Sequence, residues 1–177
     1  LAQLSSIGKK KIKVFKKVKV GIFSTGNELQ EFDSKKKKYH IFDSNKLILI
    51  SLFKKLNCDV FDLGIIKDDF LETKKKIVQN SKNFDLIITS GGISTSSIDK
   101  VSELLLSNGL INFWRLAIKP GRPIAFGKIN KTPFIGLPGN PVAAIITFFM
   151  LITQFVEKVS GNQERKLLSR CFPSSFN

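Results

Sequence analysis

Apolar and polar positions along the first half of the chain predict strands and helices in alternation. Short apolar runs bounded by polar loops are typical of strands in a covered sheet, and such runs lie at Lys17–Phe23, Val60–Ile66 and Asp85–Thr89. Helical spacing of apolar residues follows the first two runs and predicts helices over Ser44–Asn57 and Leu71–Asn80. Because the connections are short, we expect a mainly parallel sheet with helices on both faces.

The second half of the chain consists of extended runs joined by turn sequences. Lys119-Pro120-Gly121-Arg122 is typical of a turn, and Asn140 followed by Pro141 is a helix-start signal. The predicted elements are a short helix at Lys100–Ser107, strands at Phe113–Ile118, Pro123–Ile129 and Thr132–Leu137, and an apolar helix at Val142–Val159. The whole pattern predicts the α/β class, as a three-layer α/β/α domain.

The chain length of 177 residues allows one α/β domain of good size but not two ordinary ones. We expect this domain to span residues 17–160. Residues 1–16 are expected to be the end of a preceding segment or a linker, and residues 161–177 a linker or the truncated start of a C-terminal domain. Since the sequence does not begin with Met, we expect an incomplete chain.

Composition argues against membrane and zinc-stabilised classes of protein. The longest apolar stretch, Val142–Val156, contains Gln154 and is too short to cross a bilayer, and the first residues lack a signal-peptide core. Cys58, Cys171 and His40 are too few and too scattered for a structural zinc site. We therefore expect a cytoplasmic protein with no membrane partner.

The net charge of +15 comes almost entirely from lysine. Specific readers of nucleic acid use arginine for bidentate contacts, whereas scattered lysines give only a diffuse attraction. The chain has arginine only at Arg115, Arg122, Arg165 and Arg170. We therefore expect no nucleic-acid partner, and most lysine runs are expected to be solvated surface.

The segment 85–94, DLIITSGGIS, carries the strongest chemical signal, because an apolar strand opens directly into a glycine pair. Gly91 and Gly92 can adopt positive φ and bring backbone N–H groups close to phosphate oxygens at the carboxyl edge of a sheet. This pattern predicts a phosphorylated ligand. The alternative is a tight strand-to-helix turn without a ligand.

Acidic residues follow the ends of the predicted strands, at Glu28, Asp68 and Asp99. Three carboxylates beside a phosphate would repel it unless a divalent cation lay between them, which predicts a Mg²⁺ site with oxygen ligands. Each carboxylate alone is also consistent with a helix cap or a solvated loop. Arg115, Lys119 and Arg122 lie around the turn at 119–122, where they could hold an oxyanion or simply extend the lysine-rich surface.

Six ordered segments resemble the central domain of the molybdopterin molybdenumtransferase family: VGIFSTGNELQ, IFDSN, DLGIIKDD, DLIITSGGIS, FWRLAIKPGRPIAFG and GLPGNP. The resemblance spans Val14–Asn162 and implies the molybdenum-cofactor biosynthesis fold. It further implies that adenylated molybdopterin and molybdate are substrates, that Mg²⁺ is required and that AMP is released. The expected partners are a second copy of the full-length chain and other enzymes of molybdenum-cofactor biosynthesis.

The resemblance also assigns roles to residues of this sequence. It places the catalytic, metal-binding carboxylates at Glu28, Asp68 and Asp99. The substrate-binding residues that it implies are Thr25, Ser90, Gly91, Gly92, Ser94, Arg115, Lys119, Pro138, Gly139 and Asn140.

The sequence departs from the family pattern in ways that keep other functions open. Ser96-Ser97-Ile98 replaces a glycine and an acidic residue before Asp99, and Asn27 stands where Asp is common. The family's enzymes also have further domains and complete their site across a dimer. One alternative function is a molybdopterin adenylyltransferase, which has the same fold and a similar Gly-Gly loop. The other is a non-catalytic binding or scaffold module, which the altered Ser96-Ser97 loop would indicate.

Overall fold

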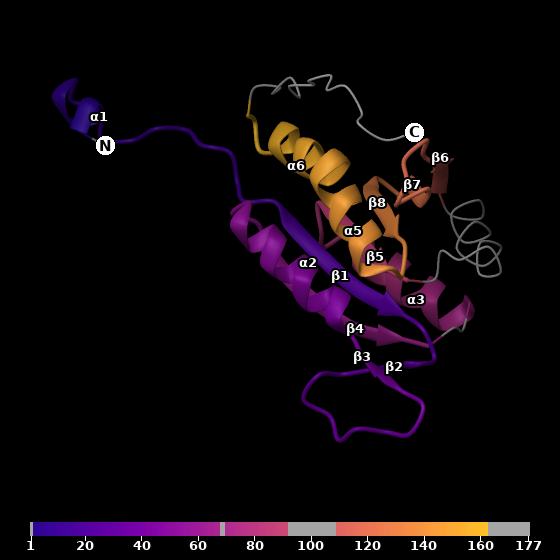
Figure 1. Cartoon of the computed structure of the whole chain (residues 1–177). Coiled ribbons are helices and arrows are strands. Elements are labelled where there is room, and N and C mark those ends of the chain that lie inside the picture. Colours follow the sequence, from indigo (N-terminus) through magenta and orange to yellow (C-terminus); the bar gives the residue numbers. More distant parts are fainter. Residues whose placement is uncertain (1, 68–69, 92–108, 163–177) are drawn as a thin grey trace, which may run out of the picture.

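The computed structural model describes residues 2–67, 70–91 and 109–162 (Figure 1). Its centre is a six-stranded sheet in the order β4-β1-β5-β8-β7-β6. The strands are β1 (Lys19–Thr25), β4 (Asp59–Ile66), β5 (Leu86–Ser90), β6 (Gly109–Arg115), β7 (Pro123–Ile129) and β8 (Thr132–Leu137). The four strands β4, β1, β5 and β8 are parallel, and β7 and β6 are antiparallel to their neighbours. The mainly parallel sheet is thus confirmed.

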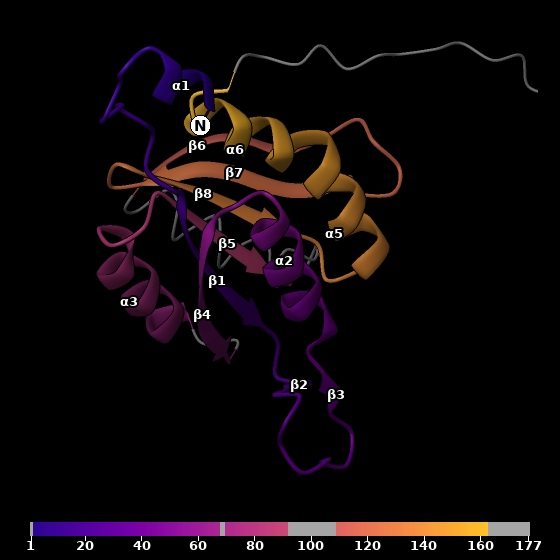
Figure 2. The ribbon, with the colours of Figure 1, turned by 90° about the vertical axis from the view of Figure 1, so that its left-hand side faces the viewer.

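Helices cover both faces of the sheet, which confirms the three-layer α/β/α architecture (Figure 2). One face carries α2 (Ser44–Lys55) and the continuous helix α5 (Pro141–Thr147), η1 (Phe148–Ile152) and α6 (Thr153–Val159), and the other carries α3 (Phe70–Ser81). A hydrophobic core lies on each face of the sheet. The buried residues of β1 contribute to these two cores in alternation, because successive strand residues point to opposite faces. Ile22 packs with Phe53 of α2 on one face, and Phe23 with Ile77 of α3 on the other.

Local signals in the sequence fix the starts of the two helices nearest the carboxyl edge of the sheet. Asp43 caps α2 by accepting a hydrogen bond from the backbone N–H of Lys46, at 3.1 Å. Asn140 caps α5 by accepting from the N–H groups of Val142 and Ala143, at 2.9 and 3.3 Å. Both helices begin within one residue of the predicted starts.

Several predicted boundaries are wrong. The strand expected at Phe113–Ile118 is β6, Gly109–Arg115, because it pairs from its first residue with Ile129 of β7. The loop after β1 contains two short strands that were not predicted, β2 (Leu29–Gln30) and β3 (Ile41–Phe42), which pair in parallel. A short helix, α1 (Ala2–Ser6), lies on an arm away from the sheet in Figure 1. The helix expected at Lys100–Ser107 lies outside the described residues.

The apolar helix from Pro141 to Val159 corrects the prediction on membrane spans. It has 19 residues, and by length and composition it is long and apolar enough to cross a membrane. The expectation that no stretch reaches that length counted only Val142–Val156. One face of the helix packs in the core through Ala144, Phe148, Ile152 and Val156, and 33% of its apolar window is buried. A π-turn interrupts it where the N–H of Thr153 donates to the carbonyl of Phe148.

Candidate functional site

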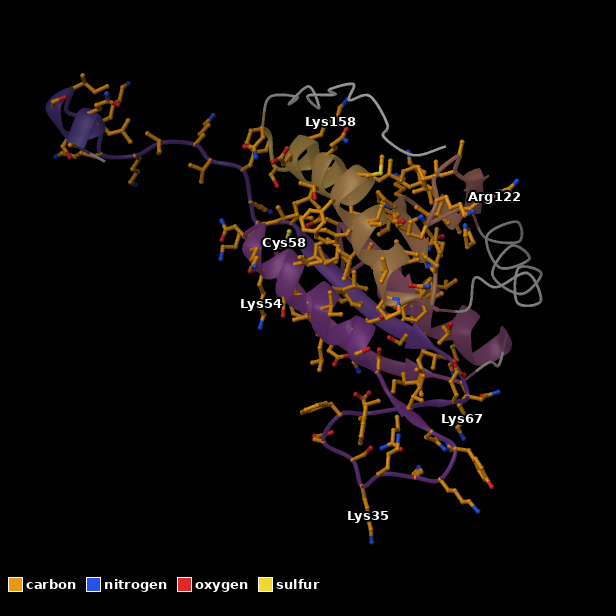
Figure 3. The ribbon with its side chains drawn as sticks, viewed as in Figure 1. Lys35, Lys54, Cys58, Lys67, Arg122 and Lys158 are labelled. Carbon is orange, nitrogen blue, oxygen red and sulfur yellow. The ribbon has the colours of Figure 1, made fainter. Side chains whose placement is uncertain are left out.

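The four parallel strands end at one edge of the sheet, and the candidate site lies there. Register pairs Thr25 of β1 with Ile66 of β4, and Ser90 of β5 with both Ser24 and Leu137. The carboxyl ends of these strands therefore meet at this edge, where ligands of open α/β sheets bind. Lys67, directly after β4, marks the edge in Figure 3.

A pocket of about 140 Å³ opens at this edge, between the ends of β1 and β5 and the first residues of α2 and α5. Its lining includes Thr25, Glu28, Asn45, Ser90, Gly91 and Gly139. The amide Nδ2 of Asn45 donates to the carbonyl of Gly139 at 2.8 Å and so joins the starts of the two helices. Since helix N-termini carry partial positive charge, this pocket favours an anionic group.

Gly91, directly after β5, lies in close contact with the ends of the two neighbouring strands, β1 and β8. Its φ is +82°, and a Cβ at this position would lie 2.5 Å from the carbonyl oxygen of Thr25. Its backbone N–H donates to the carbonyl of Leu137 at 3.1 Å. A Cβ at Gly139 would lie 3.8 Å from the Cα of Gly91, so these two glycines lie against each other. The N–H of Gly91 is thus used within the protein, and its role here is close packing.

Three polar atoms of the pocket residues are buried without a hydrogen-bond partner among the described residues. They are the hydroxyl of Thr25, a residue only 6% exposed, the carboxylate oxygen Oδ2 of Asp43 and the amide oxygen Oδ1 of Asn45. A buried polar atom without a partner is costly, which makes such atoms candidates for contact with a ligand. Asn45 was not predicted as a site residue, because the sequence DSN indicated only a helix start.

The three predicted carboxylates are only partly described. Glu28 lines the pocket, and its side chain is exposed. Asp68, Asp99, Gly92 and Ser94 lie outside the described residues. Within residues 2–67, 70–91 and 109–162, no group of three His, Cys, Asp or Glu residues is placed to hold a metal ion. The Mg²⁺ site therefore stays a prediction.

The predicted cationic residues lie at the turn between β6 and β7, next to the end of β8. The backbone of Arg115 pairs with Pro123, and the N–H of Leu116 donates to the carbonyl of Arg122 at 3.0 Å. Lys119 and Arg122 are exposed, and Figure 3 shows Arg122 well apart from Lys67. They do not line the pocket beside Thr25.

The loop 138–141 contributes through its backbone and through a helix cap. The carbonyl of Gly139 accepts the hydrogen bond from Asn45, and the side chain of Asn140 is occupied with capping α5. Pro138 is not among the residues that line the pocket, whereas Pro141 is. Of the predicted substrate-binding residues, the structure thus brings Thr25, Ser90, Gly91 and Gly139 together.

A second hollow, of about 370 Å³, lies at the opposite edge of the sheet, between the arm at Phe15 and the ends of α2 and α6. Helix C-termini point into it and carry partial negative charge, although Lys16, Lys17 and Lys55 also line it. It contains none of the predicted site residues. The carboxyl edge is therefore the candidate site.

Most of this sequence is similar to part of the sequence of curated molybdopterin molybdenumtransferases. It is 40% identical over 166 residues to the molybdopterin molybdenumtransferase of Haemophilus influenzae, covering 94% of this chain and 41% of the relative. It is 33% identical over 154 residues to the molybdopterin molybdenumtransferase of a Nostoc species, covering 85% of this chain and 35% of the relative. The chain thus spans less than half the length of these curated relatives.

Solved structures share the fold. A molybdopterin biosynthesis MoeA protein from Pyrococcus horikosii superposes with a TM-score of 0.80 at 31% identity, covering 90% of this chain and 40% of that one. The smaller MoaB protein of Thermus thermophilus, at 17% identity and a TM-score of 0.58, is similar in fold alone. The family described as a probable molybdopterin binding domain matches residues 21–158, and the chain therefore belongs to that family.

Proposed function

We propose that this chain provides the molybdopterin-binding part of an enzyme that inserts molybdate into adenylated molybdopterin and releases AMP. The pocket at the carboxyl edge supports this function, because two helix N-termini and the unpartnered hydroxyl of Thr25 meet there. Such a site suits a phosphorylated ligand. The likeness to the named molybdenumtransferases favours this reaction over others of the same fold.

The site's donors fit the proposed metal. Glu28, Thr25 and Asn45 offer carboxylate, hydroxyl and amide oxygens, which are the hard ligands that Mg²⁺ prefers. In the proposal Glu28, Asp68 and Asp99 hold the ion, and Mg²⁺ would neutralise charge on the phosphoanhydride that is cleaved. Ser90, Gly92 and Ser94 hold the phosphate beside the closely packed Gly91, and Arg115 and Lys119 receive molybdate.

A homodimer of the full-length protein, a cytoplasmic location and association with other enzymes of the same biosynthesis belong to this proposal. The curated relatives are more than twice as long as the matched region, so segments outside this chain are expected to complete the active enzyme.

The test measures binding first and turnover second. Adenylated molybdopterin is titrated into the chain with Mg²⁺. AMP release in the presence of molybdate is then followed by chromatography, with the remaining domains of the full-length enzyme supplied. We expect Mg²⁺-dependent binding, and we expect Asp99→Asn to abolish AMP release while the unfolding transition is unchanged. Asp59→Asn is the matched control, because Asp59 begins β4 at the opposite edge, where it pairs with Lys17 at 3.9 Å.

The outcomes separate the three functions. ATP consumption with molybdopterin would replace the proposal with an adenylyltransferase. Binding without AMP release, even with the remaining domains supplied, would identify a binding module. Equal turnover of Asp99→Asn and the parent chain would remove Asp99 from the mechanism.

A further inference from the structure

A buried lysine lies behind one wall of the pocket. Lys46, in the first turn of α2, has a side chain only 3% exposed. Its Nζ donates to both carboxylate oxygens of Glu31, at 2.8 and 2.7 Å, and lies 3.2 Å from Oδ2 of Asp62 and 4.0 Å from Oδ2 of Asp43. We call these four residues the Lys46 cluster. Lysine is almost never buried unless it is paired, so this arrangement calls for an explanation.

The partners of Lys46 come from three separate parts of the chain. Glu31 follows β2, Asp43 follows β3 and caps α2, and Asp62 lies on the edge strand β4. The β2–β3 ribbon, residues 26–43, projects from the sheet in Figure 1, and Phe32 and Tyr39 within it are 69% and 85% exposed. Lys46 thus ties a projecting ribbon to the helix and the sheet edge.

The ribbon forms one wall of the pocket. Glu28, Leu29, Ile41 and Phe42 all line it. Two backbone hydrogen bonds hold the ribbon's strands together, from the N–H of Ile41 to the carbonyl of Glu28 at 2.8 Å and from the N–H of Asp43 to the carbonyl of Gln30 at 3.1 Å. The position of Glu28 relative to Asn45 and Gly91 therefore depends on where the ribbon is held.

We propose that Lys46 is a positioning residue. It holds the ribbon, and with it Glu28, in the position relative to Asn45 and Gly91 that ligand binding requires. As a step in ligand binding, this role rests on the function proposed above. Lys46 does not itself line the pocket, so it acts through Glu31 and Asp43.

The charges of the cluster explain why this role needs a lysine. Glu31, Asp43 and Asp62 bring three carboxylates around one ammonium, so removing the ammonium leaves like charges that repel one another. Asp43 is 2% exposed and fixed by its cap, whereas the side chain of Glu31 is 44% exposed. Glu31 can therefore turn to solvent, and the ribbon moves with it.

The experiment compares Lys46→Met with Lys54→Met, a control on the exposed last turn of the same helix (Figure 3). Hydrogen exchange of the Ile41 and Asp43 amides reports on the ribbon, and that of Ile88 in β5 reports on the sheet. We expect Lys46→Met to speed exchange at Ile41 and Asp43 at least tenfold relative to Ile88. Lys46→Arg should restore protection, because it keeps the charge.

AMP with Mg²⁺ serves as the binding probe for the pocket. We expect Lys46→Met to weaken AMP binding at least tenfold and Lys54→Met to leave it unchanged. If the parent chain binds no AMP, the proposed function fails, while the exchange data still decide the role of Lys46.

Glu31→Gln provides a second, milder variant in case Lys46→Met does not fold. It removes the charge on the ribbon's side of the contact and should speed exchange at Ile41 by about threefold or more. Unchanged exchange at Ile41 and Asp43 in the folded variants would overturn the inference. Equal acceleration at Ile88 would also overturn it, because the effect would then be a general loss of stability.

Discussion

The contact between Gly91 and the end of β1 allows a sharp test of how the site is built. Gly91→Ala adds one methyl group at a residue with φ of +82°, where that methyl would lie 2.5 Å from the backbone oxygen of Thr25. Gly64→Ala is a matched control. Gly64 has φ of +79°, and a Cβ there meets nothing within 4 Å. The two substitutions share the backbone strain and differ in the steric contact.

The expected destabilisation follows from these two parts. A non-glycine residue at such a φ costs roughly 1–2 kcal/mol, which applies to both variants. Alanine also lowers the conformational entropy of the unfolded chain, which stabilises the folded state by about 0.4–1 kcal/mol. This effect is common to both variants and cancels in the comparison. The clash at Gly91 forces a shift of backbone, which costs about 1–3 kcal/mol, and a weakened bond to Leu137 adds about 1 kcal/mol.

Urea unfolding followed by circular dichroism measures the difference. We expect Gly91→Ala to lower the free energy of unfolding by about 2–4 kcal/mol more than Gly64→Ala does. For a chain of this length, each kcal/mol corresponds to roughly 2–4 °C in Tm. Equal destabilisation by the two variants would refute the reasoning, since it would mean that the chain relaxes around the added methyl group without cost.

Further predictions concern the helix cap, the core and the buried thiol. Asn140→Ala should lower the free energy of unfolding by about 1 kcal/mol, measured in urea, because α5 loses its capping oxygen; no change would show that the cap does not contribute. Phe148→Ala should cost about 3–5 kcal/mol, because its ring packs edge-to-face on Phe53 with centroids 4.9 Å apart. A loss below 1 kcal/mol would contradict that packing. Burial, with a smaller contribution from a neighbouring carboxylate, raises the pKa of the Cys58 thiol to about 11 from 9.0. The folded chain then keeps a proton that the unfolded chain loses, so stability should fall as pH rises from 9 towards 11. Unfolding at pH 8, 9 and 10 in a Cys171→Ser background measures this fall, and Cys58→Ala should abolish it.

The sequence by itself determined the elements and the edge at which chemistry is expected. Periodicity predicted β7, β8 and the start of α2 at the observed residues, because alternation and capping depend on near neighbours in the chain. Strand–helix order predicted the parallel sheet and therefore the shared carboxyl edge of Thr25 and Ser90. These inferences need no knowledge of which distant residues touch.

The tertiary structure decided how distant residues share the site. The hydrogen bond from Asn45 to Gly139 joins residues 94 positions apart, and the N–H of Gly91 is taken up by Leu137 of another strand. The burial of Lys46 had one trace in the sequence, its place on the same helical stripe as Leu49 and Phe53. Only the tertiary structure brings its more distant partners, Glu31 and Asp62, to its ammonium group. Side chains that meet across layers depend on sheet register and helix packing, which local pattern does not encode.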